Sequence, residues 1–197
     1  SKDNINKAYN LISTSKVRNE MIIDDVITCV ARKQTPVILT RFKEHAKFLH
    51  DALKEKADHV FLLYGDNSDK ENAEIRVKLK QIPENESLIL VATGQKIGEG
   101  FDFPRLDVLM LAAPVSFEGR LEQYVGRLNR DYVGKEAVYV YDYIDSHVRY
   151  FDKMYAKRLR TYRKMGFSIW TQELQPKQII NAIFDSVNYT EKFEQDI

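Results

Sequence analysis

Short apolar segments alternate along the chain with longer segments whose apolar residues recur at helical spacing. Two of the short segments, Leu88–Ala92 and Val108–Ala113, are apolar at every position, which is typical of strands buried on both faces of a parallel sheet. Right-handed crossovers between such strands place the functional loops at their carboxyl ends. The sequence therefore predicts an α/β fold with a mainly parallel sheet, whose other strands are Val37–Thr40, Val60–Tyr64 and Val138–Ile144.

The segments around these strands predict the helices and the division of the chain. Ser68 or Asp69 is a candidate N-cap for a helix that ends near Ile82. The other predicted helices are 17–33, 41–56, 118–130, 147–165 and 176–187. We expect three parts: an N-terminal helical segment (1–35), an α/β domain (36–166) and a helical C-terminal extension (167–197).

The composition excludes several classes of protein. The apolar runs are too short to span a bilayer, and no signal peptide opens the chain, so we expect a cytoplasmic protein. Cys29 is the single cysteine, which excludes an internal disulfide and a cysteine-based zinc cluster. His45 and His50 would lie about 140° apart on a helix, so we predict no metal site. Because the net charge is only +1, any nucleic-acid role requires a local basic surface.

A glycine-rich loop follows the predicted strand that ends at Thr93. Gly94, Gly98 and Gly100 lie in this loop, and glycines allow the backbone to approach a phosphate closely. Thr93 adds a hydroxyl at the strand tip, and Asp102 adds a carboxylate that could accept a hydrogen bond from a ribose. Read alone, such a loop is more often an ordinary connection between a strand and a helix.

The next predicted helix has one polar face. With Gln123 at zero on a helical wheel, Arg127 lies at about 40° and Arg130 at about −20°. Its apolar residues cluster on the opposite side, near about 150°. Arginine suits phosphate because its planar fork stays charged and matches the oxygens. An arginine pair at this spacing can also be a solvated surface.

Together the two segments resemble a known family. Val91–Asp102 resembles motif V of superfamily 2 helicases, and Gln123–Arg130 resembles motif VI with its Q-x-x-G-R-x-x-R pattern. Pro36–Phe42 lies where motif IV would. The resemblance covers roughly 36–144 and implies the second RecA-like domain of such a motor, a three-layer α/β/α fold.

The resemblance implies roles around ATP. Arg130 would be the arginine finger that stabilises charge on the γ-phosphate. Arg127 would bind the same phosphate or couple the two motor domains. Gln123 would help to position the nucleotide, Asp102 would contact its ribose, and Gly100 would keep that loop close to it.

The resemblance also implies contacts with nucleic acid. Thr93 would bind the nucleic-acid backbone, and Thr40 with Arg41 would hold a neighbouring phosphate. Contacts of this kind position a strand without reading its sequence. Glu99 and Gln123 depart from the arginine and histidine that many DEAD-box RNA helicases have at these positions. The run Glu99–Asp102 followed by Pro104 looks more like DNA-directed relatives such as restriction-enzyme motor subunits and repair helicases, so we expect DNA rather than RNA.

The sequence lacks the motifs that hold the triphosphate. It contains neither a G-x-x-x-x-G-K-[ST] loop nor a strand-borne Asp-Glu box. ATP and Mg would then be held mainly by a first RecA-like domain of the same full-length chain, and this segment alone would hydrolyse no ATP. The competing hypotheses are a nucleotide- or sugar-binding enzyme that uses the 94–100 loop, and a non-catalytic RecA-like scaffold.

Two other features have both functional and ordinary interpretations. The predicted helix 147–165 is basic, with interleaved aromatic residues that could stack on bases. Aromatic residues at helical spacing more often pack inward, which here would leave a basic outer face. Asp142 and Asp145 could form a catalytic pair, but solvated carboxylates at a strand end are commoner, and we assign them no catalytic role.

Overall fold

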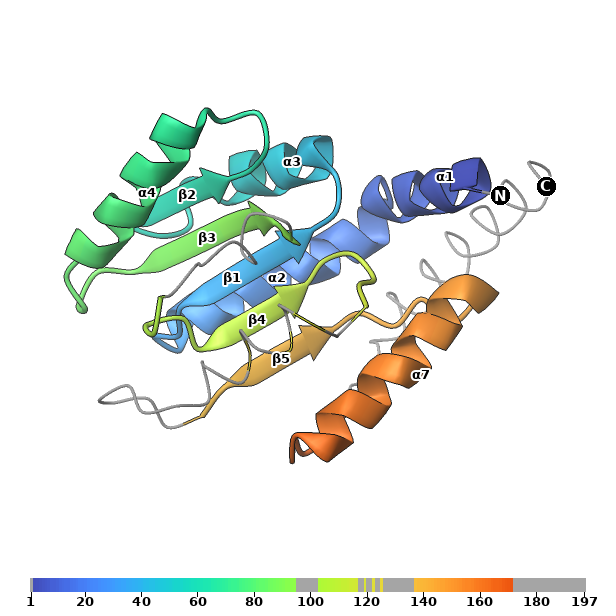
Figure 1. Ribbon diagram of the computed structural model, residues 1–197. Helices are drawn as coiled ribbons and strands as arrows, with labels where there is room; N and C mark the ends of the chain where they lie inside the picture. The colour runs from blue at the N-terminus through green and yellow to red at the C-terminus, as the bar shows by residue number, and fades with distance from the viewer. Residues whose placement is uncertain are drawn as a thin grey trace. The chain divides into compact units, whose positions relative to one another are not determined.

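The computed structural model describes residues 2–94, 103–116, 119, 122, 125 and 137–171 (Figure 1). The chain divides into two compact units. The sheet unit comprises Ile22–Ala112 and Glu118–Asp142, and the helical unit comprises Ser1–Met21, Ala113–Phe117 and Tyr143–Ile197. The described elements are α1 (Lys2–Ser13), α2 (Lys16–Ala31), β1 (Pro36–Thr40), α3 (Lys43–Leu53), β2 (His59–Leu63), α4 (Asp69–Gln81), β3 (Leu88–Thr93), β4 (Val108–Leu111), β5 (Tyr139–Asp142) and α7 (Arg149–Lys164).

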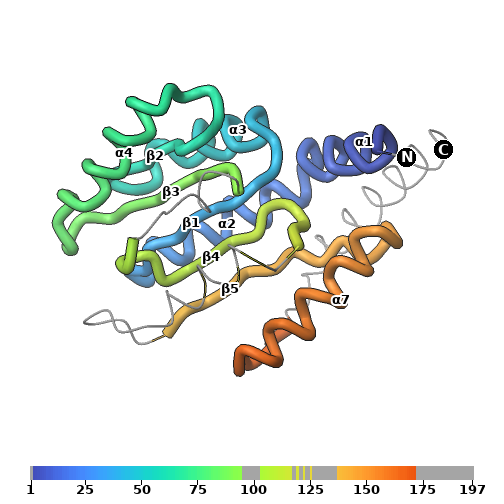
Figure 2. Tube along the Cα trace, in the orientation of Figure 1, coloured from blue at the N-terminus to red at the C-terminus, as the bar shows by residue number. Residues whose placement is uncertain are grey.

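The sheet unit contains five strands in the order β2-β3-β1-β4-β5. Every neighbouring pair is parallel, so the predicted parallel α/β fold is confirmed. The three central strands are buried at every position, which explains their unbroken apolar sequence. The Cα trace shows the strands side by side in this order (Figure 2).

Helices cover the two faces of the sheet. In the strand order, the connection from β1 to β2 runs toward the β2 edge of the sheet. The connection from β2 to β3 runs back toward the β5 edge. Right-handed crossovers therefore place α3 and α4 on opposite faces, and α4 lies in front of the sheet in Figure 1. The part of α2 in this unit lies behind the sheet, where Ile22, Val26 and Cys29 are fully buried.

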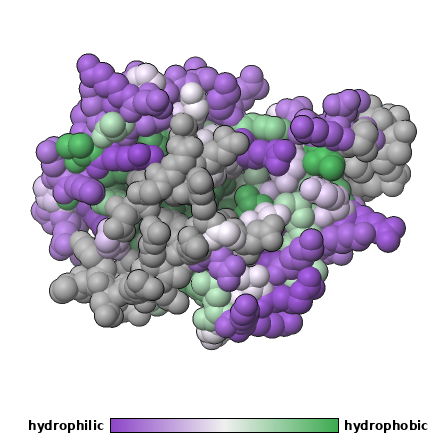
Figure 3. All heavy atoms as spheres, viewed as in Figure 1, coloured by the Kyte–Doolittle hydropathy of each residue, from purple (hydrophilic) through white to green (hydrophobic). Residues whose placement is uncertain are grey.

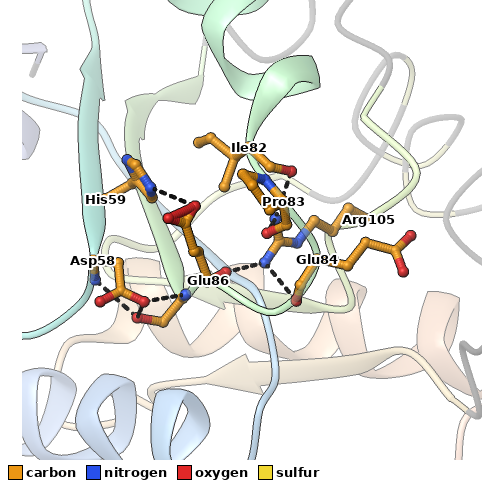
Figure 4. Close-up of polar contacts among 8 residues, drawn as sticks. Asp58, His59, Ile82, Pro83, Glu84, Glu86 and Arg105 are labelled. Atoms are coloured by element: carbon orange, nitrogen blue, oxygen red, sulfur yellow. Dashed lines mark hydrogen bonds and ion pairs between the residues drawn. The ribbon is translucent and has the colours of Figure 1, made fainter.

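Both ends of α4 are capped by side chains. Ser68 is the N-cap, as predicted, and it forms a capping box with Glu71. Beyond the other end, the Arg105 guanidinium donates to the carbonyl oxygens of Ile82 (3.4 Å) and Pro83 (3.1 Å), and also to those of Glu84 and Glu86 (Figure 4). Arg105 thus fixes the turn between α4 and β3, which is a structural task.

In the helical unit, α1 and α7 both contact the short segment 113–116. The Tyr9 hydroxyl in α1 donates to the Pro114 carbonyl oxygen at 3.0 Å. Arg158 in α7 donates to the Val115 carbonyl oxygen at 3.1 Å and is only 1% exposed. The rings of Tyr9 and Phe151 meet edge to face with their centroids 4.8 Å apart. Two helices therefore hold this short segment through its backbone carbonyl groups.

A buried ion pair joins α2 to the segment before α7 in the same unit. Arg18 donates two hydrogen bonds to the Asp145 carboxylate, from Nε to Oδ1 and from Nη2 to Oδ2, each at 3.0 Å. Asp145 is only 4% exposed, so the expectation of a solvated carboxylate is wrong here. A bidentate arginine satisfies both oxygens, which gives Asp145 a structural role.

The remaining predictions divide into confirmed and untested ones. Of the four aromatic residues of α7, Phe151 and Tyr162 are buried, Tyr155 is half-buried and Tyr150 is 43% exposed, so the inward packing of the commoner interpretation holds for two of them. The predicted helices 118–130 and 176–187 lie outside the described residues, and the three-part division stays a prediction. In the described part of the chain, no helix is long and apolar enough to cross a membrane, and no group of three or more metal-ligating side chains occurs.

Candidate nucleotide and nucleic-acid interface

Two threonines predicted to serve the site lie next to each other at the carboxyl edge of the sheet. Thr40 ends β1 and Thr93 ends β3, and their Cα atoms are partners in the parallel register. Thr40 is 1% exposed and Thr93 is 7% exposed. Because all strands are parallel, the loop that begins at Gly94 leaves the sheet from this same edge. The fold thus joins residues that are far apart in the sequence.

The Thr40 hydroxyl is held by His45, which the sequence analysis considered only as a metal ligand. Thr40 Oγ1 lies 2.6 Å from Nδ1 of His45, which is 3% exposed in the first turns of α3. This hydrogen bond fixes the threonine rotamer and orients the imidazole. Its only sequence signal is a histidine five residues after a strand tip, which is too weak to identify it.

An exposed arginine and the N-terminus of a helix lie at this edge. Arg41 follows Thr40 and is exposed, and α3 begins two residues later with Phe42 as an N-cap whose side chain makes no capping hydrogen bond. The backbone N–H groups of a first helical turn favour anions. Guanidinium and backbone N–H groups are both phosphate-binding groups, so this edge is chemically suited to a polyanion.

Lys43 and Asp66 connect the start of α3 to the turn after β2. Lys43 Nζ lies 2.6 Å from Asp66 Oδ1, and both side chains are 56% exposed. The hydrogen bond to Asp66, followed by its negative charge, raises the pKa of Lys43. The two residues are 23 positions apart, so no periodicity in the sequence could reveal the pair.

The turn after β2 is fixed by asparagine side chains. Asn67 Nδ2 donates to the Leu62 carbonyl oxygen at 2.7 Å and to Asn72 Oδ1 at 3.0 Å. Asn72 is 4% exposed and donates to the Tyr64 carbonyl oxygen at 3.4 Å. This network gives the edge of the sheet a second ordered turn beside the α3 N-terminus.

The other predicted site residues lie outside the described residues, and their roles stay predictions. These are Gly100, Asp102, Gln123, Arg127 and Arg130. At the edge formed by Thr40 and Thr93, the described groups are the two hydroxyls, the Arg41 cation, the N–H groups of the α3 N-terminus and the Lys43–Asp66 ion pair. Hydroxyl, guanidinium and helix N–H groups are kinds of group that can contact phosphate, and the roles predicted for Thr40, Arg41 and Thr93 stay predictions.

Residues 18–131 match the family described as "Helicase conserved C-terminal domain". This match covers more than half of the chain and includes every predicted site residue. Transcript termination protein A18 of Yaba-like disease virus is 32% identical over 120 residues, which is 60% of this chain and 24% of the relative. The chain thus spans about a quarter of that relative's length.

Solved structures share the fold. T4 UvsW superposes with a TM-score of 0.63 at 23% identity, covering 79% of this chain and 34% of UvsW. Domain 2 of the DEAD-box helicase Mss116p, solved with an RNA duplex, gives a TM-score of 0.52 at 17% identity, covering 95% of this chain and 76% of that one. Their sheet is the RecA-like sheet that the sequence predicted.

Proposed function

The chain belongs to the helicase C-terminal domain family, and we propose that it is the second motor domain of an ATP-dependent nucleic-acid helicase or translocase. In this role it supplies an arginine finger and part of the nucleic-acid track. A first RecA-like domain of the same full-length protein would hold most of the ATP and its Mg.

The observation that supports this proposal most is the register pairing of Thr40 with Thr93 inside the family match. Two segments predicted to touch nucleic acid, 53 residues apart in sequence (93 − 40), end side by side at one edge of the sheet. The exposed Arg41 stands at the same edge. We assign the direct phosphate contact there to Arg41 and Thr93, and an orienting role to Thr40, because its hydroxyl is engaged by His45.

On the nucleotide side, we assign Arg130 to the γ-phosphate and Arg127 to the same phosphate or to coupling between the motor domains. Gln123 positions the nucleotide, while Asp102 and Gly100 approach the ribose. When bound, ATP supplies the free energy for movement. The arginine offsets the negative charge that develops during phosphoryl transfer.

We propose DNA as the nucleic acid, because the run Glu99–Asp102 followed by Pro104 resembles DNA-directed members of the family. A nucleotide titration of the 197-residue chain, then of the full-length protein with and without DNA or RNA, tests the class of function. We expect the chain alone to hydrolyse no ATP and the full-length protein to be stimulated more by DNA than by RNA. Tight nucleotide binding by the chain alone would instead support the enzyme that uses the 94–100 loop.

The arginine finger is tested by Arg130→Ala in the full-length protein. We expect kcat for ATP hydrolysis to fall by about 10³- to 10⁵-fold, the range found for arginine fingers, with little change in nucleotide affinity. Lys47→Ala on the exposed side of α3 is the matched control and should leave kcat unchanged. Magnesium-dependent hydrolysis by the isolated chain, abolished by Arg130→Ala, would contradict the proposed division of labour.

A further inference from the structure

Helix α7 of the helical unit has a cationic face. With Arg149 at zero and about 100° per residue, six basic residues fall between about −40° and +80°. The buried residues Phe151, Arg158 and Tyr162 fall between about 180° and 220°. The two faces are therefore opposite, and the six basic residues are Arg149, Lys153, Lys157, Arg160, Arg163 and Lys164.

All six basic residues are exposed. In the described part of the chain, none of them forms an ion pair with a carboxylate. Asp152 is the single acidic residue of α7. Hydrophilic residues cover the side of α7 that faces the viewer in Figure 3. The chain as a whole has a net charge of +1, so this face is a local excess of positive charge.

This concentration of charge is unfavourable for the helix itself. Arg149 and Lys153, Lys153 and Lys157, and Arg160 and Lys164 are each four positions apart, and like charges at this spacing destabilise a helix. Asp152, three positions after Arg149, is the one acidic residue of α7 and offsets only part of this charge. A polyanion that binds this face would relieve the repulsion, which is a physical reason to look for a partner.

The apolar side of α7 is already occupied. Phe151 packs on Tyr9 with a centroid distance of 4.8 Å, and Tyr162 packs on Phe167 at 6.0 Å. A helix that inserts into a membrane surface needs its apolar side free for lipid. The available face of α7 therefore offers charge with little apolar area, which suits a phosphate backbone better than a bilayer.

We propose that the outer face of α7 binds the phosphate backbone of nucleic acid without reading its sequence. From Arg149 to Lys164 the helix rises about 22 Å, a length along which each strand of a duplex presents about six or seven phosphates. Tyr150 lies at the border of the cationic face and is 43% exposed, so it can stack on an unpaired base. The choice of nucleic acid as the polyanion rests on the proposed function.

The test is equilibrium binding of the 197-residue chain to fluorescent single-stranded and duplex DNA, without ATP, over a range of salt concentrations. The variant Lys153→Gln/Lys157→Gln removes two charges from the centre of the face, and glutamine keeps the helix propensity of lysine. The matched control is Lys78→Gln/Lys80→Gln on α4, where both lysines are exposed. Both variants lower the net charge of the chain by the same amount. Circular dichroism checks that each variant is folded.

We expect the α7 variant to weaken duplex binding by roughly tenfold at low salt and to reduce the slope of log K against log salt by about 1.8, because each lost phosphate contact contributes about 0.9. The α4 variant should keep the wild-type slope. Equal effects of the two variants, an unchanged slope in the α7 variant, or binding only to anionic lipid vesicles would overturn the proposal.

The same variants in the full-length protein separate this proposal from the proposed function. If Arg130→Ala abolishes ATP hydrolysis while the α7 variant binds DNA normally, the α7 proposal alone fails. If the α7 variant loses DNA affinity while Arg130→Ala keeps its ATPase activity, the cationic face is supported and the arginine-finger assignment fails.

Discussion

Both units bury apolar side chains, but among the described residues only the helical unit also buries arginine and aspartate. Strands β1, β3 and β4 bury aliphatic side chains such as Ile38, Leu90 and Leu109 at 0% exposure. The helical unit buries Arg158 at 1% and the Arg18–Asp145 pair at 8% and 4%. Aliphatic packing is non-directional, whereas buried charges require partners at defined positions. The two units should therefore respond differently to substitution.

The two units also differ in how the backbone is held in place. In the helical unit, Tyr9 and Arg158 donate to the carbonyl oxygens of Pro114 and Val115. Hydrogen bonds at such positions fix the backbone path of the segment directly before residues 118–130. In the sheet unit, aliphatic side chains fill the interior, and the register of the paired parallel strands fixes the backbone. Side-chain donors therefore hold the backbone at Pro114 and Val115 in the helical unit, whereas strand pairing holds it in the sheet unit.

The largest expected effect comes from breaking the buried ion pair. Asp145→Ala should destabilise the protein by about 3–5 kcal/mol, because Arg18 would be left buried without its counter-charge. The double variant Arg18→Leu/Asp145→Leu removes both charges and should recover most of this loss. Urea unfolding followed by circular dichroism measures both. If the double variant lost as much free energy of unfolding as Arg18→Leu and Asp145→Leu lose together when measured separately, the ion pair would not be the source of the effect.

A smaller effect is expected in the interior of the sheet unit. Ile38→Val in β1 removes one buried methylene group and should cost about 0.5–1.5 kcal/mol in the free energy of unfolding. The same unfolding experiment measures it, with Ile27→Val as control because Ile27 is 37% exposed. If Ile38→Val lowered the free energy of unfolding as much as Asp145→Ala, the expected contrast between the two interiors would be wrong.

The smallest expected effect concerns an exposed carboxylate in the sheet unit, for comparison with the buried Asp145. The Ser87 backbone N–H and then its hydroxyl donate to Asp58 at 2.8 and 3.1 Å, which lowers the pKa of Asp58 below its ordinary value of 3.8. A carboxyl group whose pKa is lower in the folded than in the unfolded protein stabilises the fold at any pH above its unfolded-state pKa. This stabilisation disappears as the pH falls through the folded-state pKa. It is therefore present at neutral pH and lost in acid.

NMR titration of the Asp58 carboxyl carbon measures this directly. Ser87→Ala removes the hydroxyl but keeps the backbone N–H, so the pKa of Asp58 should rise only part of the way to 3.8. A wild-type pKa at or above 3.8 would show that these hydrogen bonds do not stabilise the ionised carboxylate in solution.

The sequence by itself determined the features that depend on near neighbours. The parallel strands follow from unbroken apolar runs, the Ser68 cap from its place before a helical segment, and the inward aromatic residues of α7 from helical spacing. The family resemblance also came from contiguous motifs in 91–130. Each of these signals lies within a short stretch of sequence. Over such a stretch, hydrophobic periodicity and local hydrogen bonding decide which secondary structure forms.

Only the tertiary structure decided which distant residues meet. It placed Thr40 beside Thr93, brought His45 onto the Thr40 hydroxyl, and buried Asp145 against Arg18, 127 positions away. Asp145 was expected to be solvated because its local sequence says nothing about a partner so distant. Strand order and helix packing create such pairs, since they depend on how the whole chain buries its apolar surface.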